Sequence, residues 1–381
     1  MISVKYIRSL DQVEQLSPED HRKLAPVAQK YKFRANDFYL RLINWEDPDD
    51  PIRKIVIPTT GELESFGELD ASDEETNYVA PGCQHKYPRT VLLLCNEICG
   101  AYCRFCFRKR LFMDENEEVV NDVAEGIEYI RKNMQVTNVL LTGGDPLLMS
   151  TRRLENILRP LRKIDHVGII RIGSKMPAIN PYRIINDADL LPMLSRYSTR
   201  HRRIYIMAHF NVPQELSEPA IFALDLLRRA GVIMVNQTPI VKGINDDPHV
   251  LADLMRRLSF VGAPPYYFFQ CRPTEGNKPF ALTLVATYLA FVEAKKKVSG
   301  LAKRARLVMS HASGKIEMVG LTGDRIYLRY HRAKNEADEE RFMIFHRDDD
   351  AYWLDELVPA DQTPHPVRQY GHRPAHALGP E

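Results

Sequence analysis

The chain has 381 residues, 44% of them hydrophobic, which is enough for a large core in one extended domain or in two. The formal net charge is only +2, so the overall charge does not indicate nucleic acid or a membrane surface as a partner. The first residues lack the apolar segment of a signal peptide, and apolar runs elsewhere are too short to span a bilayer. We therefore expect a cytoplasmic protein that binds neither nucleic acid nor membranes.

The first 84 residues predict a helical and irregular extension. Residues 18–43 can form two helices, whereas residues 47–82 are rich in Pro, Gly, Asp and Glu and predict a segment that follows the surface. Residues 301–356 form a separate C-terminal segment, and the proline-rich residues 357–381 predict a flexible tail.

Between residues 85 and 300, short β-rich runs alternate with helical patterns. The helix expected at 151–164 contains Pro160, which should kink or end it. This alternation predicts six βα units that build a parallel sheet with helices outside, as an open doubly wound sheet or as a partial barrel. The six runs are 91–95, 136–145, 167–174, 203–210, 232–240 and 265–271.

In either arrangement the chemistry belongs at the C-terminal ends of the strands, where several polar or glycine residues are found. Two adjacent glycines would let the backbone approach a ligand closely, and the aspartate after them could accept a hydrogen bond from a cofactor amine. The residues at these ends are Gly143, Gly144, Asp145, Ser174, His209, Gln237 and Arg272.

Three of the six cysteines, Cys99, Cys103 and Cys106, have the spacing C-x3-C-x2-C on the loop after the first β-rich run. Thiolates are soft ligands that favour zinc or iron–sulfur clusters, and a structural zinc site needs a fourth ligand. Since the sequence has no second cysteine pair, we expect an iron–sulfur cluster with one open iron. Cys95 is either a fourth thiolate or, as we favour, a core residue.

Four basic residues accompany these cysteines. Arg104 and Arg108 are interleaved with the cluster loop, and we expect both to bind a carboxylate bidentately. For Lys109 and Arg110 we expect surface positions.

The run CGAYCRFCFRKR (99–110) resembles the signature of the radical S-adenosylmethionine superfamily, and more narrowly that of the lysine 2,3-aminomutase family. Other motifs occur in the order of that family, and the resemblance covers roughly residues 40 to 320. They are DPIRKIVIP, APG, HKYP, LLTGGDPLL, IIRIGSKMP, AHFNVPQEL, NQTPIVKGINDD, PYYFFQC and SGKI.

The resemblance implies a partial (β/α)6 TIM-type barrel that binds a 4Fe–4S cluster, S-adenosylmethionine and pyridoxal 5′-phosphate. It implies an isomerase that moves an amino group from the α to the β carbon of a small amino acid, with an electron donor such as flavodoxin or ferredoxin. The oligomeric state is left open. Alternatives are a radical enzyme of the same lineage without aminomutase activity, a lysine mutase serving protein modification, and a non-catalytic iron–sulfur or zinc protein.

The resemblance also implies roles for single residues. Ser174, His209 and Gln237 match cofactor-facing positions, as does the Gly-Gly-Asp motif. Lys315 matches the lysine that binds pyridoxal phosphate covalently, although the glycine run before it is shorter than in the family. Lys86 and Arg89 resemble the pair that binds the cofactor phosphate, with Arg89 displaced by one residue and Thr90 in the usual place.

At the substrate, Arg108 matches the residue that holds the α-carboxylate. Lysine enzymes of the family carry an aspartate for the substrate ammonium where this chain has Arg272. An arginine would repel that ammonium, so we expect a substrate with an acidic or neutral side chain, such as glutamate. The alternative is that Arg272 turns away and Glu275 supplies the negative charge.

Overall fold

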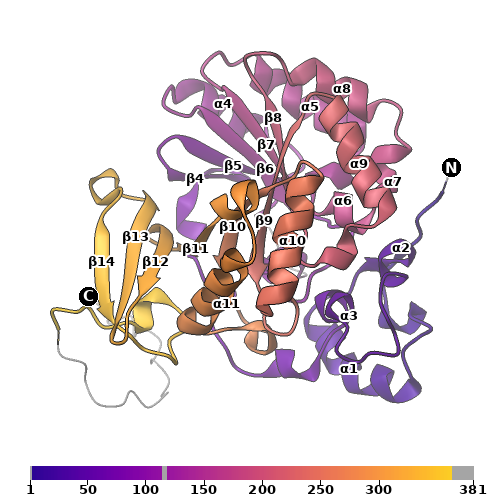
Figure 1. The fold of residues 1–381 in the computed structure, drawn as a ribbon. Coiled ribbons are helices and arrows are strands. Elements are labelled where there is room, and N and C mark those ends of the chain that lie inside the picture. Colours follow the sequence, from indigo (N-terminus) through magenta and orange to yellow (C-terminus); the bar gives the residue numbers. More distant parts are fainter. Residues whose placement is uncertain (1, 114–117, 363–381) are drawn as a thin grey trace, which may run out of the picture.

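The computed structural model describes residues 2–113 and 118–362 (Figure 1). Its centre is a run of parallel strands that lie side by side in chain order, which confirms the predicted partial barrel. Each predicted β-rich run contains one of them. The strands are β5 (Thr90–Asn96), β6 (Asn138–Gly143), β7 (Ile169–Ser174), β8 (Ile204–Ala208), β9 (Ile233–Ile240) and β10 (Pro265–Gln270).

Helices cover the outer face of these strands, because each presents an apolar stripe to the sheet (Figure 1). In α5, for example, Leu154, Ile157, Leu158 and Leu161 are all buried, and the helix ends two residues beyond Pro160. The helices are α4 (Ala124–Lys132), α5 (Thr151–Arg162), α6 (Met176–Ile179), α7 (Tyr182–Ile185), α8 (Leu190–Tyr197), α9 (Glu218–Arg229), α10 (Pro248–Phe260) and α11 (Leu284–Lys296).

The inward face of the strands is less tightly covered than the outward face. In β7, Ile170 and Ile172 are wholly buried under the helices, whereas Arg171 and Gly173 on the other face are only half-buried. The same alternation runs through β6 and β9. The interior of the partial barrel therefore remains accessible to a ligand.

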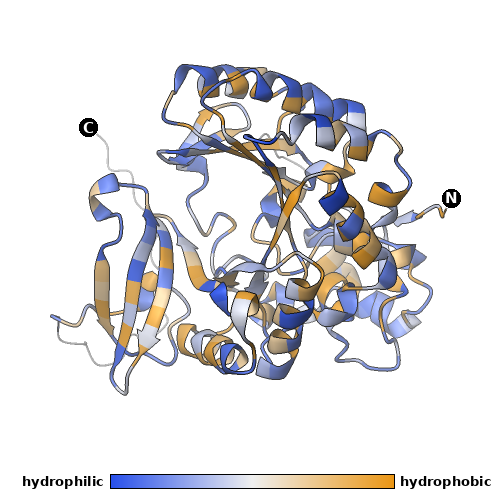
Figure 2. Cartoon of the chain, turned by 45° about the horizontal axis from the view of Figure 1, so that its top comes forward, coloured by the Kyte–Doolittle hydropathy of each residue, from blue (hydrophilic) through white to orange (hydrophobic). Residues whose placement is uncertain are grey.

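The C-terminal segment extends this sheet further than the six predicted units. Strand β11 (Arg306–His311) pairs in parallel with β10, and β12 (Gly314–Leu321), β13 (Arg325–Ala333) and β14 (Phe342–His346) continue it antiparallel. Figure 1 shows these last strands projecting to one side of the barrel. In the coloured view of Figure 2, apolar and polar residues alternate along them, as expected for strands with one buried face.

Residues 357–362, expected at the start of a flexible tail, pack against β14. The N–H of His346 donates to Val358 O at 2.8 Å, and the N–H of Ala360 donates to Ile344 O at 3.0 Å. Leu357 is buried in the C-terminal core. The remaining residues of the expected tail lie outside the described residues.

The N-terminal extension packs as a separate layer beside the barrel (Figure 1). The two helices expected in residues 18–43 are α1 (Pro18–Lys30) and the short α2 (Asp37–Leu40), followed by α3 (Pro51–Val56). Strands β1 (Tyr6–Ile7) and β2 (Ala35–Asn36) form a small ribbon, and β3 (Tyr78–Ala80) and β4 (Cys83–Tyr87) add antiparallel strands beside β5. Its apolar core includes Phe105 of the cysteine loop, so this layer supports the predicted site.

None of the helices in residues 2–113 and 118–362 combines the length and apolarity that crossing a membrane requires.

Candidate active site

The three cysteines of the C-x3-C-x2-C motif lie together on the loop that leaves the C-terminal end of β5. Cys99 and Cys106 pack against the same apolar cluster, and the N–H of Cys106 donates to Cys103 O at 3.0 Å. Burial raises the pKa of Cys99, and the nearby Asp145, Cys106 and Cys103 raise it further. The backbone N–H of Arg108 is a hydrogen-bond partner of the Cys106 sulfur. In the described part of the chain no three His, Cys, Asp or Glu side chains converge on one point. Three free cysteines on one loop fit a cube in which three of the irons are each bound by one thiolate.

Cys95 does not belong to this set. It is buried with Leu93 and Leu141 in the main core, and its sulfur donates to Thr142 O at 3.6 Å. Of the two alternatives for Cys95, the structure supports the core residue. Three thiols remain, so one iron of a bound cluster would have no cysteine ligand.

Glycine is needed at positions 143 and 144 for a different reason from the one predicted. A Cβ at Gly143 would lie 2.5 Å from Asn96 O, and one at Gly144 would lie 2.5 Å from Ile98 O. Gly143 also has a φ of +109°, which other residues rarely adopt. The glycines are therefore needed for close packing of this turn against the cysteine loop, and the nearest backbone is the protein's own.

Asp145 also serves the backbone rather than presenting a free carboxylate. Its Oδ2 accepts the N–H groups of Lys175 at 2.7 Å and Met176 at 3.1 Å, and its Oδ1 accepts the N–H of Leu147 at 3.0 Å. Burial raises its pKa to about 6, against the opposing effect of these bonds and of the Ser174 hydroxyl. Because a carboxylate has about four acceptor positions, little capacity is left for a cofactor amine. The prediction for Asp145 was wrong in this respect.

The other predicted cofactor residues end neighbouring strands. Ser174 accepts the N–H of Met176 at 3.0 Å, which fixes the turn after β7. His209 follows β8, with its ring edge-on to Phe105 of the cysteine loop at 6.1 Å. Burial lowers the His209 pKa well below its usual value, and its buried Nε2 has no hydrogen-bond partner. Gln237 lies on the half-buried inner face of β9. An unpaired buried nitrogen beside the cluster loop fits a polar ligand at this position.

Arg104 was expected to bind a ligand carboxylate, but it binds the protein's own Glu62. Its Nη2 lies 2.8 Å from Glu62 Oε2 and its Nε lies 3.0 Å from Oε1, and both side chains are almost wholly buried. Lys109, expected at the surface, is also buried, with its Nζ 3.2 Å from the same carboxylate. This buried trio fastens the N-terminal extension to the cysteine loop.

Replacing Glu62 by Gln should therefore lower the free energy of unfolding by about 3–5 kcal/mol, because it leaves Arg104 and Lys109 buried without a counter-charge. Chemical denaturation of the two proteins measures the difference. Glu64→Gln, at an exposed position of the same segment, should change it by less than about 0.5 kcal/mol. Equal stability of Glu62→Gln and the unchanged protein would contradict this account.

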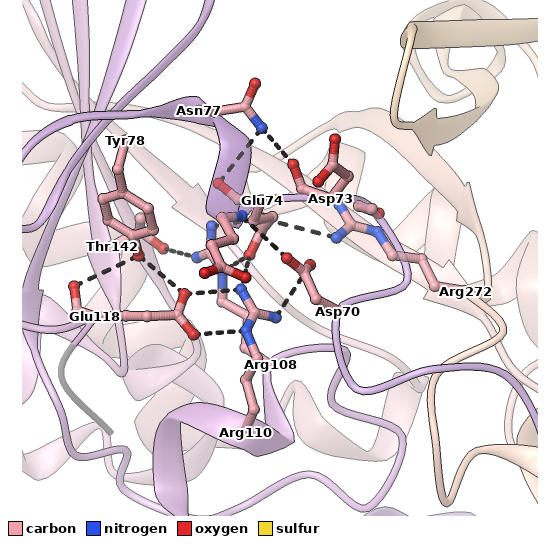
Figure 3. A network of polar contacts seen from close by, with 12 residues as sticks. Asp70, Asp73, Glu74, Asn77, Tyr78, Arg108, Arg110, Glu118, Thr142 and Arg272 are labelled. Atoms are coloured by element: carbon pink, nitrogen blue, oxygen red, sulfur yellow. Dashed lines mark hydrogen bonds and ion pairs between the residues drawn. The ribbon is translucent and has the colours of Figure 1, made fainter. Parts of the chain in front are cut away.

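Glu74 is the centre of a second buried network, in which Arg108 and Arg110 take part (Figure 3). Arg108 holds the Glu74 carboxylate bidentately, with Nε and Nη2 each 3.0 Å from an oxygen. Arg110, also expected at the surface, donates from Nη2 to Glu74 at 2.9 Å and from Nε to Glu118 at 2.7 Å. Burial alone would raise the pKa of Glu74, but Arg108, Arg272 and Arg110 outweigh it and hold that pKa well below its usual value.

Arg272 points into this network rather than away from it. Its guanidinium lies 3.7 Å from the centre of the Phe107 ring, and its Nη1 lies 3.8 Å from Glu74 Oε1. Glu275 instead pairs with Lys30 at 2.6 Å and accepts the Tyr31 hydroxyl. The alternative in which Glu275 supplies the charge in place of Arg272 is therefore wrong.

Lys315 is the second residue of β12, directly after a tight hairpin. The pair His311 and Gly314 closes the hairpin, and the Ser313 hydroxyl bonds both the His311 ring and the Tyr330 hydroxyl. A Cβ at Gly314 would lie 2.4 Å from Arg332 O, so this single glycine is required by strand packing. The backbone before Lys315 is thus fixed by the hairpin, although the glycine run there is short.

The Lys315 amine lies 4.3 Å from the centre of the Tyr267 ring, on the inner side of the barrel. Burial lowers its pKa well below the usual value, and the neighbouring cations Arg332, Arg171, Arg272 and Lys86 lower it further. A lysine kept neutral in this way is a competent nucleophile for an aldehyde.

Of the two residues predicted to bind the cofactor phosphate, only Lys86 lies near Lys315. Lys86 lies near Lys315 and donates from Nζ to His311 O, and burial lowers its pKa to about 8. Arg89 is exposed, and its contact with the barrel is through its backbone carbonyl, which accepts the N–H of Asn138. The structure therefore does not bring the Arg89 side chain to Lys315.

Three residues of the site were not found from the sequence. Arg171 had a signal, since it is a charged residue inside the otherwise apolar strand IIRIGS. Glu74 and Arg332 had none, because their partners lie far away in the chain.

Comparison with known proteins agrees with this geometry. The family model described as "Radical SAM superfamily" matches residues 93–255. A protein of Aquifex aeolicus (strain VF5) described as "Putative L-lysine 2,3-aminomutase" is 51% identical over 93% of this chain and 95% of its own length. The L-lysine 2,3-aminomutase of Clostridium subterminale is 37% identical over 73% of this chain and 66% of its own. The glutamate 2,3-aminomutase of Clostridioides difficile (strain 630) is 33% identical over 72% and 64%.

Proposed function

From the fact that this chain belongs to the radical S-adenosylmethionine superfamily, and within it to the lysine 2,3-aminomutase family, we propose that it is a 2,3-aminomutase for an amino acid with an acidic or neutral side chain, such as glutamate. Family membership itself makes it a radical aminomutase, an isomerase that acts on a small molecule and needs a reductant. It is also consistent with a 4Fe–4S cluster, S-adenosylmethionine and pyridoxal phosphate.

In this proposal Cys99, Cys103 and Cys106 hold the cluster, and His209 and Gln237 face the cofactors. When bound, the cluster and S-adenosylmethionine supply a radical that removes a substrate hydrogen, and pyridoxal phosphate holds the migrating nitrogen. Lys315 attaches that cofactor, and its lowered pKa keeps the amine neutral and nucleophilic. Asp145 acts as a positioning residue, since its bonds to the turn after β7 hold Ser174 beside the cysteine loop.

One observation carries the choice of substrate: the buried Arg108 and the partly buried Arg272 both approach a single protein carboxylate, Glu74. Arg108 donates one N–H each from Nε and Nη2 to Glu74 and one from Nη1 to Thr142, which leaves two of its five N–H groups. Those two can take the substrate's α-carboxylate.

Arg272 has no closer ion pair than Glu74 at 3.8 Å in the described residues. Burial lowers the Arg272 pKa, and the Arg108 guanidinium nearby lowers it further. A second carboxylate on the substrate would relieve this charge, whereas an ammonium would add to it. These considerations support a dicarboxylic amino acid.

One observation favours a different substrate. A cavity of about 830 Å³ opens next to Pro273, between the N-terminal extension and the C-terminal strands. Six carboxylates line this cavity, together with only one lysine and one histidine. A cavity with this excess of negative charge attracts cations. Lysine is therefore the second candidate substrate. The acidic residues are Glu68, Asp70, Asp73, Asp350, Asp355 and Glu356.

The test is turnover by the reconstituted, reduced enzyme with glutamate, lysine and neutral amino acids, followed by chromatography of β-amino isomers. We expect glutamate to be the better substrate. Arg272→Gln should lower kcat/KM for glutamate about 30- to 1000-fold, the loss of 2–4 kcal/mol typical of a buried charge contact. Robust turnover of lysine with none of glutamate would reject the acidic substrate.

A matched control separates recognition from general damage. Arg256→Gln removes an exposed arginine whose partner is Asp253, and it should leave the kcat/KM for glutamate unchanged. In Arg272→Gln the formation of 5′-deoxyadenosine without substrate should also persist, because all three cysteines of the loop are kept.

A further inference from the structure

Two arginines and the basic side chain of Lys315 meet on the inner side of the barrel without an acidic partner among the described residues. Lys315 and Arg332 are directly opposite each other on β12 and β13, and Arg171 lies on β7 across the interior. Of the charged neighbours, Arg332 and Arg171 lower the pKa of Lys315 most, and Arg332 is the charged neighbour that lowers the pKa of Arg171. Three strands distant in sequence thus place positive charge at one position.

Polar side chains on two neighbouring strands accept hydrogen bonds from the two guanidinium groups and so orient them toward this position. Arg332 donates from Nη2 to the Thr90 hydroxyl at 2.9 Å, and Arg171 donates from Nε to Asn138 Oδ1 at 2.8 Å. Thr90 and Asn138 are themselves directly paired, as the first residues of β5 and β6. The two guanidinium groups therefore approach the same point of the sheet from different sides. Arg332 is further held by stacking on the Tyr87 ring, 4.4 Å from its centre.

The charge of this group is not balanced by the protein. The buried arginines of the cysteine loop, Arg104 and Arg108, each bind a glutamate. Within residues 2–113 and 118–362, none of Lys315, Arg171 and Arg332 makes an ion pair with Asp or Glu. Burial and the Arg332 charge lower the pKa of Arg171 to about 10, as expected for a cation without a counter-ion. Since like charges held together in the half-buried interior of the barrel repel one another, the arrangement favours binding of an anion.

We propose that Arg171 and Arg332 bind the phosphate of pyridoxal phosphate, in place of the exposed Arg89. Two planar guanidinium forks suit a phosphate dianion, which offers several acceptor oxygens. Lys315 on the strand beside Arg332 then reaches the aldehyde of the same molecule. This inference rests on the proposed function, because it presupposes attachment of that cofactor to Lys315.

The experiment compares pyridoxal phosphate with pyridoxal, which has the same aldehyde but no phosphate. Both ligands are titrated into the full-length protein, followed by the absorbance of the attached cofactor and by the mass after borohydride reduction. Arg332→Gln and Arg171→Gln should each weaken pyridoxal phosphate about 10- to 100-fold, as for a lost charged hydrogen bond, and pyridoxal less than about 3-fold. Arg89→Gln should leave both affinities unchanged.

The outcomes separate this inference from the proposed function. If the unchanged protein attaches pyridoxal phosphate but Arg89→Gln weakens it and the other two variants do not, only the phosphate site is rejected. Equal losses for both ligands also reject it, since they indicate general damage. If the unchanged protein attaches neither ligand, the cofactor assignment and the phosphate site both fail. Should Arg332→Gln not fold, Arg171→Gln makes the same comparison.

Discussion

Replacement of Cys99, Cys103 or Cys106 by alanine is expected to prevent stable cluster assembly and to lower 5′-deoxyadenosine formation by more than about 100-fold. Loss of a residue that merely supports a metal ligand costs about 10- to 100-fold, and loss of the ligand itself should cost more. The three thiols lie on a single loop, so no other described cysteine can replace the missing one. Iron and sulfide content, the visible absorbance and product formation after anaerobic reduction measure the effect.

Cys95→Ala is the matched control, because it removes a cysteine of the same segment that lies in the core. It should keep full iron content and 5′-deoxyadenosine formation. The free energy of unfolding should fall by about 0.5–3 kcal/mol, since a buried side chain is shortened. Loss of iron in Cys95→Ala, or full iron content in Cys103→Ala, would contradict the three-cysteine site.

Lys315→Ala is expected to abolish covalent attachment of pyridoxal phosphate and to lower amino-group migration by more than about 1000-fold. The position surrounds one amine with aromatic rings and cations, and these keep it neutral and therefore nucleophilic. Reductive cleavage of S-adenosylmethionine should persist, because Lys315 is not on the cysteine loop. Cofactor absorbance and mass report attachment, and chromatography reports migration.

Lys334→Ala tests whether any nearby lysine would have the same effect. Lys334 is exposed and donates to the Thr76 hydroxyl, so its removal should change neither attachment nor migration. Attachment that survives Lys315→Ala and disappears in Lys334→Ala would move the cofactor away from the barrel interior.

Local pattern was sufficient to predict six βα units, whereas the choice of a partial barrel over an open sheet came from the family resemblance. Each strand is a short apolar run and each helix has an apolar stripe. Both patterns repeat within a few consecutive residues, so they can be recognised in the sequence. The cysteine motif was equally accessible, because residues 99–106 form one loop whose ligand spacing is written directly in the sequence. The parallel strand β11 was missed, since residues 301–356 were considered apart from the βα rhythm of the barrel.

What only the tertiary structure decided is which charges neutralise one another. By sequence alone Arg104, Arg108, Lys109 and Arg110 were divided between ligand and solvent, whereas all four pair with Glu62 or Glu74. Arg108 and Glu74 are 34 residues apart, and Arg332 and Thr90 are 242 apart.

Residues so far apart in the chain become neighbours only when the sheet forms. The local pattern of apolar and polar residues therefore does not reveal such a pairing. The sequence by itself therefore predicted the βα units, the three candidate cluster thiols and the candidate cofactor lysine. The folded sheet decided which cations have partners and which remain for an anion, because that depends on the burial of both members of each pair.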